Sequence, residues 1–477
     1  MEAVMAGSRK INFANCDVLG FDMDYTLSRY KFVPFFNMVY EGVCTFLVEH
    51  KNYSSSIFHG LNEDKDLIYK GLIVDFQKGN VLKLGHDGII LRATHGTKTL
   101  SQREIETVYK DKKFADYESF KQGMKSADGK WRFFENYFDI PGLVAFSKII
   151  DYFREQNMYE SSSTYEHVWA DVLAALEDMY SPSHFADCRG HFFKHMTKDM
   201  NKYATPASQQ VKDWLRALRM NNRKLFLLTS SYPDFAAHVM NFILGSDWRS
   251  YFDLILTGGR KPRFFTESKP FIEVKNQKLG QEVKRLRTGG EYCHGNYSDL
   301  MVFLREVTKK QDPTVIYFGD NLWADAWPSK TLGGWKSVLV LEEMDAEGYV
   351  VSDGTVPGHE IVIDDASKPL SKQKIKYEHS SLVTAEEMEL MVSDFWGSIF
   401  LDENSTASEI LPPSRFSLEA RQMNTAFGDL ISQYSDICVP SIEYLSGVPV
   451  DHNFTAFSED FGNSNGFHPG CPRSLLP

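Results

Sequence analysis

The chain has 477 residues, 43% of them hydrophobic and 24% charged, which is the balance of an ordinary soluble globular protein. Its 52 basic and 64 acidic residues give a formal net charge of −12, whereas a protein that binds nucleic-acid backbones needs a basic surface. The N-terminal residues lack the apolar core of a signal peptide, and no apolar run is long enough to span a membrane. The six cysteines are sparse and scattered. We therefore expect a cytoplasmic protein in a reducing compartment, with neither a nucleic-acid polymer nor a membrane as partner.

Apolar runs and helical spacings alternate along the chain, and this alternation predicts an α/β architecture. An early strand is predicted at residues 16–21, and it runs into Asp22. Apolar residues at helical spacing follow within 36–47, and a strand, turn and strand at 79–92 predict a hairpin. A long helix-rich stretch is predicted at 139–200.

The second half of the chain repeats this pattern more clearly, with apolar strands that each end at a polar residue. We predict helices at 211–218 and 235–243, and strands at 225–228, 254–256 and 315–318. In open α/β sheets, ligands bind at the carboxyl ends of the strands. The polar residues that follow these strands are therefore expected to converge.

Beyond about residue 346 the pattern weakens. Residues 384–387 match a capping box, and this predicts a helix whose apolar face runs from Met388 to Ile399. Residues 403–416 are rich in Ser, Pro and Glu and are expected to form a loop. The last fifteen residues are expected to be a frayed end.

The sharpest motif is Asp22-Met-Asp24-Tyr-Thr26, which lies at the end of the first predicted strand. Two carboxylates two residues apart repel each other unless a cation is present. Mg²⁺ suits such a pair because it binds one or two carboxylates, water and a substrate phosphate. The motif is common by itself, so its meaning depends on what converges on it.

Four later residues make an ordered set with this motif. Asp320 follows the strand predicted at 315–318, and Asp325 comes five residues later. Between the two acidic clusters, Thr229 lies at one strand end and Lys261 just past another. The acid pair, the hydroxyl, the lysine and the second acid pair thus form an ordered set along the chain.

Each of these residues also has an ordinary structural alternative. Aspartate at a strand end, as at Asp320, often belongs to a turn. Thr229, Ser230 or Ser231 could cap the helix that follows. Lys261 precedes a proline and could be a solvated loop cation.

The ordered set resembles the four motifs of the haloacid dehalogenase superfamily of phosphohydrolases. Further stretches are similar to the 5′-nucleotidase domain-containing proteins, which are relatives of cytosolic purine 5′-nucleotidase, and most of all to their type 1 members. These stretches are RATHGT at 92–97, FENYFDIPG at 134–142, YFDLIL at 251–256 and RKP at 260–262. The resemblance covers about residues 13–400 and then fades.

The resemblance implies a role for each acid. Asp22 would be the nucleophile that accepts the phosphoryl group as an aspartyl-phosphate, which splits one difficult step into two. Asp24 would be the general acid and base that protonates the leaving oxygen and then activates water. Asp320 would bind Mg²⁺ together with Asp22 and the main-chain carbonyl of Asp24. Asp325 would orient the metal's water molecules or Lys261.

The resemblance also implies which residues contact the substrate. Thr229, with Ser230 beside it, would donate hydrogen bonds to the phosphoryl oxygens, and Lys261 would neutralise their charge in the transition state. Phe138 matches an aromatic residue that stacks on a base in the family, although a core role is the more common one for phenylalanine. The polar residues that hold the nucleotide in the purine nucleotidase are replaced within 167–176, so purine specificity does not carry over.

A histidine-rich stretch offers a competing metal site. His184, Cys188, His191 and His195 fall at helical spacings, but a helix of that length rises about 16 Å, so one ion cannot reach all four. We expect a single helix whose phenylalanines are packed and whose histidines are half exposed.

Taken together, the sequence predicts a doubly wound, mainly parallel α/β sheet with a large inserted cap. The catalytic core is assigned to 1–34 and 205–400, the cap to 35–204 and a C-terminal extension to 401–477. The expected activity is Mg²⁺-dependent hydrolysis of a small phosphomonoester, by resemblance a nucleoside 5′-monophosphate, although a phosphorylated sugar fits equally well. Phosphotransfer to an acceptor other than water and a scaffold protein that has lost turnover are the alternatives. Formation of a homo-oligomer is left open.

Overall fold

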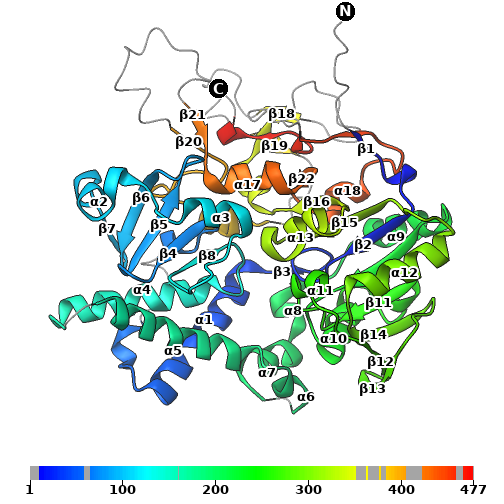
Figure 1. Ribbon diagram of the computed structural model, residues 1–477, viewed down its shortest axis with the longest axis horizontal. Coiled ribbons are helices and arrows are strands. Elements are labelled where there is room, and N and C mark those ends of the chain that lie inside the picture. Colours follow the sequence, from blue (N-terminus) through cyan, green and yellow to red (C-terminus); the bar gives the residue numbers. More distant parts are fainter. Residues whose placement is uncertain are drawn as a thin grey trace, which may run out of the picture. The chain divides into compact units, whose positions relative to one another are not determined.

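The computed structural model describes residues 10–58, 65–158, 161–187, 189–350, 361–363, 375–377, 383–403, 422–457 and 466–475 (Figure 1). Contacts divide the chain into two compact units. Unit 1 consists of Met1–Tyr30, Ala204–Val383 and Ile431–Arg473. Unit 2 consists of Lys31–Tyr203, Thr384–Leu430 and Ser474–Pro477.

Unit 1 is built on a nine-stranded sheet in the order β13-β12-β14-β11-β10-β2-β15-β16-β22. The seven strands from β14 to β22 run parallel, and β12 and β13 complete the sheet as antiparallel strands. The strands are β2 (Val18–Phe21), β10 (Lys224–Leu228), β11 (Leu254–Thr257), β12 (Phe271–Lys275), β13 (Lys278–Val283), β14 (Gly290–His294), β15 (Val315–Gly319), β16 (Lys336–Val340) and β22 (Ile437–Val439). The predicted fold class is confirmed by this mainly parallel sheet.

Helices cover both faces of this sheet because its central strands are apolar on both sides. On one face, Phe226 and Tyr317 join a core with Leu300 and Leu304 of α12 (Tyr297–Thr308). On the other face, the rings of Phe21 and Phe318 lie 6.0 and 6.2 Å from that of Trp214. Trp214 belongs to α9 (Gln209–Met220), and the other helices of unit 1 include α10 (Pro233–Leu244), α11 (Arg263–Thr266), α13 (Trp327–Thr331), α14 (Glu343–Glu347) and α18 (Ile442–Ser446).

Four short antiparallel pairs also belong to unit 1, and one of them joins β18 (Ile361–Ile363) to β19 (Ile375–Tyr377). β1 (Lys10–Ile11) pairs with β23 (Phe454–Thr455), and β17 (Tyr349–Val350) pairs with β24 (Cys471–Pro472). β3 (Arg29–Tyr30) pairs with β9 (Ala204–Thr205), so the chain leaves unit 1 and re-enters it on neighbouring strands.

The predicted domain boundaries are wrong at the C-terminal side. Residues 384–400, which we assigned to the catalytic core, belong to unit 2. Residues 431–473, which we assigned to a separate extension, belong to unit 1, where β22 supplies the ninth strand of the sheet. A three-residue strand carries too little periodic signal to be recognised from the sequence alone.

Unit 2 contains a five-stranded antiparallel sheet in the order β7-β6-β5-β4-β8. The predicted hairpin at 79–92 is confirmed, because β5 and β6 are antiparallel neighbours. The strands are β4 (Leu72–Asp75), β5 (Asn80–Leu84), β6 (Ile90–His95), β7 (Lys98–Thr99) and β8 (Trp131–Phe134). The helices include α1 (Phe32–Lys51), α2 (Gln102–Val108), α3 (Tyr117–Gly123), α4 (Ile140–Glu155), α5 (Ser162–Met179), α6 (Pro182–Ala186), α7 (His191–Lys198), α8 (Met200–Tyr203) and α17 (Ala426–Tyr434), which continues into unit 1.

One described helix, α1, is long and apolar enough by composition to cross a membrane. Within unit 2 it packs against α4, α5 and α7, and residues such as Phe32, Phe35 and Leu47 are buried. The apolar character of α1 is therefore that of a helix packed inside a protein core.

Two predicted helices end earlier than expected. The capping box of Thr384 and Glu387 is present, but α15 (Ala385–Met391) stops eight residues before Ile399. The single helix predicted through the histidine-rich stretch is also wrong, because α6 ends before Gly190, which has a φ of +70°, and α7 begins at His191. A positive φ is readily adopted by glycine and interrupts helical geometry.

The four-ligand zinc site that we rejected includes Cys188, which lies outside the described residues.

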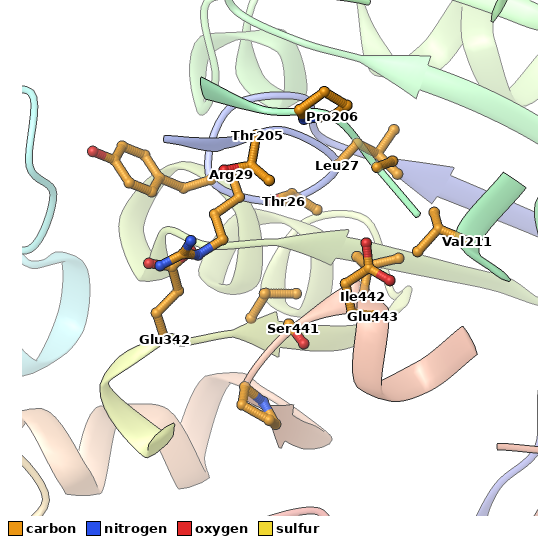
Figure 2. Close-up of a pocket in the computed structure, with 14 residues that line it drawn as sticks. Thr26, Leu27, Arg29, Thr205, Pro206, Val211, Glu342, Ser441, Ile442 and Glu443 are labelled. Carbon is orange, nitrogen blue, oxygen red and sulfur yellow. The ribbon is translucent and has the colours of Figure 1, made fainter. Parts of the chain in front are cut away.

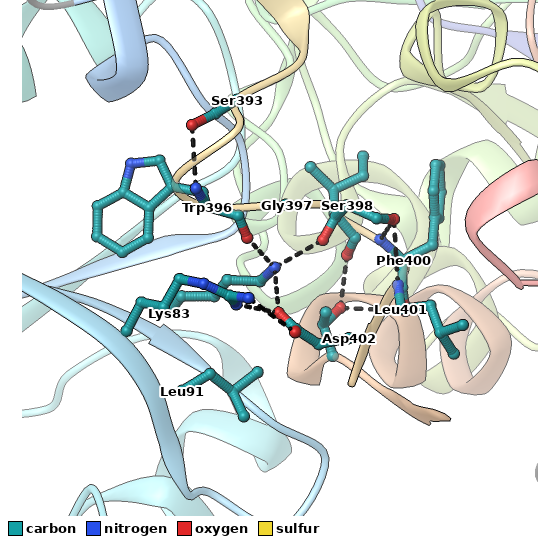
Figure 3. Close-up of polar contacts among 12 residues, drawn as sticks. Lys83, Leu91, Ser393, Trp396, Gly397, Ser398, Phe400, Leu401 and Asp402 are labelled. Carbon is teal, nitrogen blue, oxygen red and sulfur yellow. Dashed lines mark hydrogen bonds and ion pairs between the residues drawn. The ribbon is translucent and has the colours of Figure 1, made fainter. Parts of the chain in front are cut away.

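A buried polar cluster attaches the segment after α15 to the sheet of unit 2. Lys83 on β5 donates hydrogen bonds to Asp402 and to the Ser398 carbonyl, both at 2.8 Å, and to the Trp396 carbonyl. Asp402 lies on β20 (Leu401–Glu403), which pairs with β21 (Gln422–Asn424). The Asp402 carboxylate also accepts hydrogen bonds from Arg92. Figure 3 shows Lys83 and Asp402 pointing toward each other. The Lys83 side chain is only 3% exposed, so its charge depends on Asp402 for compensation.

His468, in the C-terminal part of unit 1, should make the stability of the protein depend on pH. Burial lowers the pKa of His468 from 6.5 to about 4, against the opposite effect of the hydrogen bond between its Nε2 and the Thr455 carbonyl. The unfolded chain therefore binds a proton that the folded chain excludes. We expect the free energy of unfolding to be fully retained above about pH 6.5 and to fall by about 3 kcal/mol as the pH drops to 4.

Urea unfolding of the wild type and of His468→Gln, at neutral pH and near pH 4.5, measures this effect. The variant should lose less stability than the wild type between the two conditions, because glutamine keeps a hydrogen-bond donor but does not titrate in this range. An equal loss in both proteins would show that His468 is not responsible.

Candidate active site

The register of three central strands brings the predicted acids to one edge of the sheet. Phe21 of β2 lies opposite Leu227 of β10 and Phe318 of β15. Asp22 follows Phe21 directly, and its backbone N–H donates to the Phe318 carbonyl at 2.8 Å. Thr229 comes two residues after Leu227, and Asp320 comes two residues after Phe318. Asp22, Thr229 and Asp320 therefore lie at the carboxyl ends of adjacent parallel strands.

Lys261 is a buried cation at the centre of this group. Its Nζ lies 2.9 Å from Asp22 Oδ1 and 2.5 Å from Asp325 Oδ1. It also donates to the hydroxyl of Tyr317 at 3.0 Å, and Tyr317 in turn donates to the Leu228 carbonyl at 2.8 Å. The ammonium therefore makes two hydrogen bonds, to Asp325 and Tyr317, and an ion pair with Asp22. The Lys261 side chain is only 2% exposed, so the alternative that Lys261 is a solvated loop cation is wrong.

Electrostatics keep Lys261 charged. Burial by itself would lower the pKa of the ammonium, but the charges of Asp22 and Asp325 raise it well above its ordinary value. Burial also raises the pKa of Asp325, against the lowering effect of Lys261.

Both carboxylate oxygens of Asp325 accept hydrogen bonds. Its Oδ2 accepts a hydrogen bond from Asn321 N–H at 3.2 Å, while its Oδ1 is held by Lys261. Gly319 permits this position, because a Cβ there would lie 2.4 Å from Asp325 Cβ. Oxygens of Asp22, Asp320 and Asp325 lie within 4.8 Å of one another, and all three residues are buried. These three carboxylates together could hold a metal ion.

Asp24 lies beside this cluster and is held by two hydroxyl groups. Tyr30 donates to its Oδ1 at 2.6 Å, and Ser231 donates to its Oδ2 at 2.8 Å. Burial and the charge of Asp22 raise the pKa of Asp24 to about 6, although the hydrogen bonds from Tyr30 and Ser231 oppose this rise. A carboxyl group with such a pKa can give and take a proton near neutral pH.

Thr229 and Ser230 occupy different environments. The Thr229 side chain is fully buried, and its Oγ1 accepts a hydrogen bond from Ser231 N–H at 3.1 Å. Ser230 is exposed, and its Oγ accepts from the backbone N–H of Lys261 at 3.2 Å. The helix-cap alternative is wrong for all three hydroxyl residues, because the residue that caps α10 is Tyr232 and its side chain makes no capping hydrogen bond.

Comparison with known proteins identifies the family. The model of the 5′ nucleotidase family matches residues 6–461. The chain belongs to this family. As a member of the 5′-nucleotidase family it is a phosphatase-type hydrolase, and the family predicted from the motifs is confirmed.

Relatives in this family match between about three quarters and nearly all of the chain. 5′-Nucleotidase domain-containing protein 1 of Homo sapiens is 33% identical over 474 residues, which are 98% of each chain. 5′-Nucleotidase domain-containing protein 2 of Rattus norvegicus is 26% identical over 355 residues, 73% of this chain and 61% of its own. A solved 2-haloacid dehalogenase from Pseudomonas syringae aligns with a TM-score of 0.24 and 12% identity over 72% of this chain and 92% of its own. The expectation that the resemblance fades after residue 400 is wrong, since the family model extends to residue 461.

Among the family's predicted substrate contacts, Phe138 lies in unit 2. Its ring packs edge-on against Phe35 at 5.3 Å and Tyr180 at 5.6 Å. The Tyr180 hydroxyl also donates to the Phe138 carbonyl at 3.1 Å. Phe138 thus has the neighbours of a core residue, and stacking on a base stays a prediction.

A small cavity in unit 1 lies next to the motif residues of this 5′-nucleotidase but does not suit a substrate (Figure 2). Its volume is about 30 Å³, and its lining includes Thr26, Arg29 and Glu342. A pocket for a small organic ligand has about 300–1,000 Å³. The cavity has room for about one water molecule.

Three residues that contact the predicted catalytic side chains were not recognised from the sequence as part of the site. Tyr30 and Tyr317 contact Asp24 and Lys261, and Ser231 contacts Asp24. Tyr317 lies inside a predicted strand and reads as a core residue, and Tyr30 lies six residues past Asp24 without a local pattern. Ser231 was considered only as a helix cap, although its position two residues after Thr229 was a usable signal.

Proposed function

We propose that this member of the 5′-nucleotidase family hydrolyses phosphate monoesters with the help of Mg²⁺, through a phosphorylated Asp22. The observation that carries the proposal is the convergence of Asp22, Asp320 and the Lys261–Asp325 pair at the carboxyl ends of the central strands. Asp24, with its raised pKa, lies beside this group and supplies the acid that the reaction requires.

The charge of the site fits a divalent cation. Asp22, Asp320 and Asp325 bring three buried carboxylates together, and Lys261 is the cation that contacts two of them. Oxygen ligands of this kind suit Mg²⁺, and Asp22 and Asp320 would hold it. A bound Mg²⁺ would supply a positive charge that stabilises the phosphoryl oxygens.

The residues then divide the reaction between them. An oxygen of Asp22 attacks phosphorus, and the bond between phosphorus and the leaving oxygen breaks while Asp24 gives that oxygen a proton. In the second step Asp24 takes a proton from water as the water oxygen attacks phosphorus, which releases phosphate and restores Asp22. Lys261 lies 2.9 Å from Asp22 Oδ1 and stabilises the negative charge that develops on the transferred group. Ser230, which is exposed just after β10, would contact its oxygens.

The substrates we propose are nucleoside 5′-monophosphates, in line with the names of the relatives. The residues of unit 1 described above act on the phosphoryl group and do not select a base. Phosphorylated sugars are therefore chemically compatible with the same steps.

Release of inorganic phosphate from a panel of nucleoside monophosphates and sugar phosphates tests the proposal. Activity should require Mg²⁺ and disappear with EDTA. Asp320→Asn should raise the Mg²⁺ concentration for half-maximal activity by about 10–100-fold, because one charged ligand becomes neutral. Asp213→Asn, a change at an exposed position of α9, is the matched control. Activity that is unchanged by EDTA would contradict the metal requirement.

A further inference from the structure

The carboxylate of Asp24 is held on both sides by hydroxyl donors, but the two donors differ in rigidity. Ser231 is a short side chain, is only half-buried, and donates to Oδ2 at 2.8 Å. Tyr30 is fully buried, with an exposure of 0%, and donates to Oδ1 at 2.6 Å. Tyr30 is therefore the contact that is less free to move.

Several contacts fix Tyr30 in this position. Its backbone pairs with Ala204 where β3 meets β9, and its ring lies edge-on to that of Tyr25 at 5.1 Å. The preceding residue, Arg29, points the opposite way along the strand and forms an ion pair with Glu342 at 2.9 Å. Figure 2 shows Arg29 extending toward Glu342.

The loop between Asp24 and Tyr30 is also closed by its own hydrogen bonds. The backbone N–H and the hydroxyl of Ser28 both donate to the Met23 carbonyl, at 2.8 and 3.0 Å. The chain thereby folds back so that a residue six positions later can reach the carboxylate of Asp24. The loop carries both the acid and the group that holds it.

We propose that Tyr30 is a positioning residue for Asp24, whose hydroxyl fixes Oδ1 and so directs Oδ2 to exchange the proton with the leaving oxygen and with water. The inference rests on the proposed phosphatase function. Tyr30 keeps its own proton throughout. Because Oδ1 accepts from Tyr30, the proton of a protonated Asp24 is carried by Oδ2, and the Ser231 hydroxyl can rotate to accept there.

Leaving groups that differ in their need for a proton test this role. An alkyl phosphate such as a nucleoside 5′-monophosphate needs protonation as it leaves, whereas nitrophenolate leaves without it. Tyr30→Phe should lower kcat/KM for the nucleotide by about 30–100-fold, because a displaced catalytic group costs about that much. In a single turnover of p-nitrophenyl phosphate, release of nitrophenolate should change by less than about 3-fold. A uniform loss for both leaving groups would overturn the proposal.

Two further variants separate positioning from general damage. Tyr292→Phe removes another hydroxyl from a buried tyrosine of unit 1, one that accepts from Arg287 N–H, and should leave the ratio of the two activities unchanged. In an Asp24→Ala background, Tyr30→Phe should cause no further loss in turnover of p-nitrophenyl phosphate, because its effect passes through Asp24. An additional loss of 10-fold or more there would contradict the proposal.

The failure of this proposal is distinct from failure of the proposed function. If the wild type turns over neither kind of ester with Mg²⁺ present, the phosphatase function itself is wrong and the role of Tyr30 falls with it. If the wild type is active and the loss in Tyr30→Phe does not depend on the leaving group, only the role of Tyr30 is wrong. Thermal unfolding of each variant shows that the comparison is made between folded proteins.

Discussion

Replacement of Asp22 by asparagine should reduce phosphate release from any active substrate by at least about 10⁴-fold, the scale of loss when a catalytic nucleophile is removed. Asparagine has nearly the shape of aspartate, but its amide does not attack phosphorus. The change also removes one of the two carboxylates that contact Lys261. We expect the variant to fold, since Asp325 still pairs with Lys261.

Steady-state phosphate release with Mg²⁺ measures this loss, and acid quenching with ³²P-labelled substrate shows whether a phosphorylated protein forms. The wild type should carry label after the quench, and Asp22→Asn should carry none. Asp24→Asn is the informative comparison, because it keeps the nucleophile and should still become labelled by p-nitrophenyl phosphate. Equal activity of Asp22→Asn and the wild type would refute the assignment of the nucleophile.

The second large effect concerns stability rather than turnover. Asp402→Leu should lower the free energy of unfolding of unit 2 by about 3–5 kcal/mol, because it removes the carboxylate that pairs with the buried Lys83. Burial alone would raise the pKa of Asp402, yet the contacts with Arg92 and Lys83 lower it, so the carboxylate is charged in the folded protein. Urea unfolding followed by circular dichroism measures the change.

A double-mutant cycle separates the buried charge from the lost hydrogen bonds. Lys83→Met with Asp402→Leu should recover most of the stability lost by Asp402→Leu, since neither charge is then buried. Arg92→Met is the matched single change, and it should cost less because Arg92 is 30% exposed and Asp402 keeps Lys83. A double variant no more stable than Asp402→Leu would show that the pair itself is needed, beyond compensation of charge.

The local parts of the site could be predicted because they follow apolar strands. The runs before Asp22, Thr229 and Asp320 each have the composition of a buried parallel strand, and the motif order then indicates which residues converge. The partners that complete the site could not be found in this way. Tyr317 reaches Lys261 across two strands, and Tyr30 reaches Asp24 only because the loop closes at Ser28. Such contacts depend on register and turn geometry, which a single sequence does not specify.

The division into units was less predictable for a related reason. Ile437–Val439 forms a strand of only three residues, yet it completes the core sheet beside β16. Residues 384–403 look like a continuation of the core in sequence but are held to unit 2 by Lys83, which lies more than three hundred positions earlier. Contacts over such separations leave no periodic pattern in either partner.

The pairing of β1 with β23 has a consequence for synthesis of the protein. Lys10 and Ile11 lie opposite Thr455 and Phe454, so the first strand finds its partner only after almost the entire chain has been made. At ribosomal speeds of about 5–20 residues per second, the first strand waits roughly 20–90 s for that partner. β2 likewise lacks β15 until Gly319 has been made, so one edge of the nascent sheet stays unpaired for roughly 15–60 s. Nascent chains of this protein should therefore depend on chaperones that shield exposed strand edges, and slower translation would prolong that dependence.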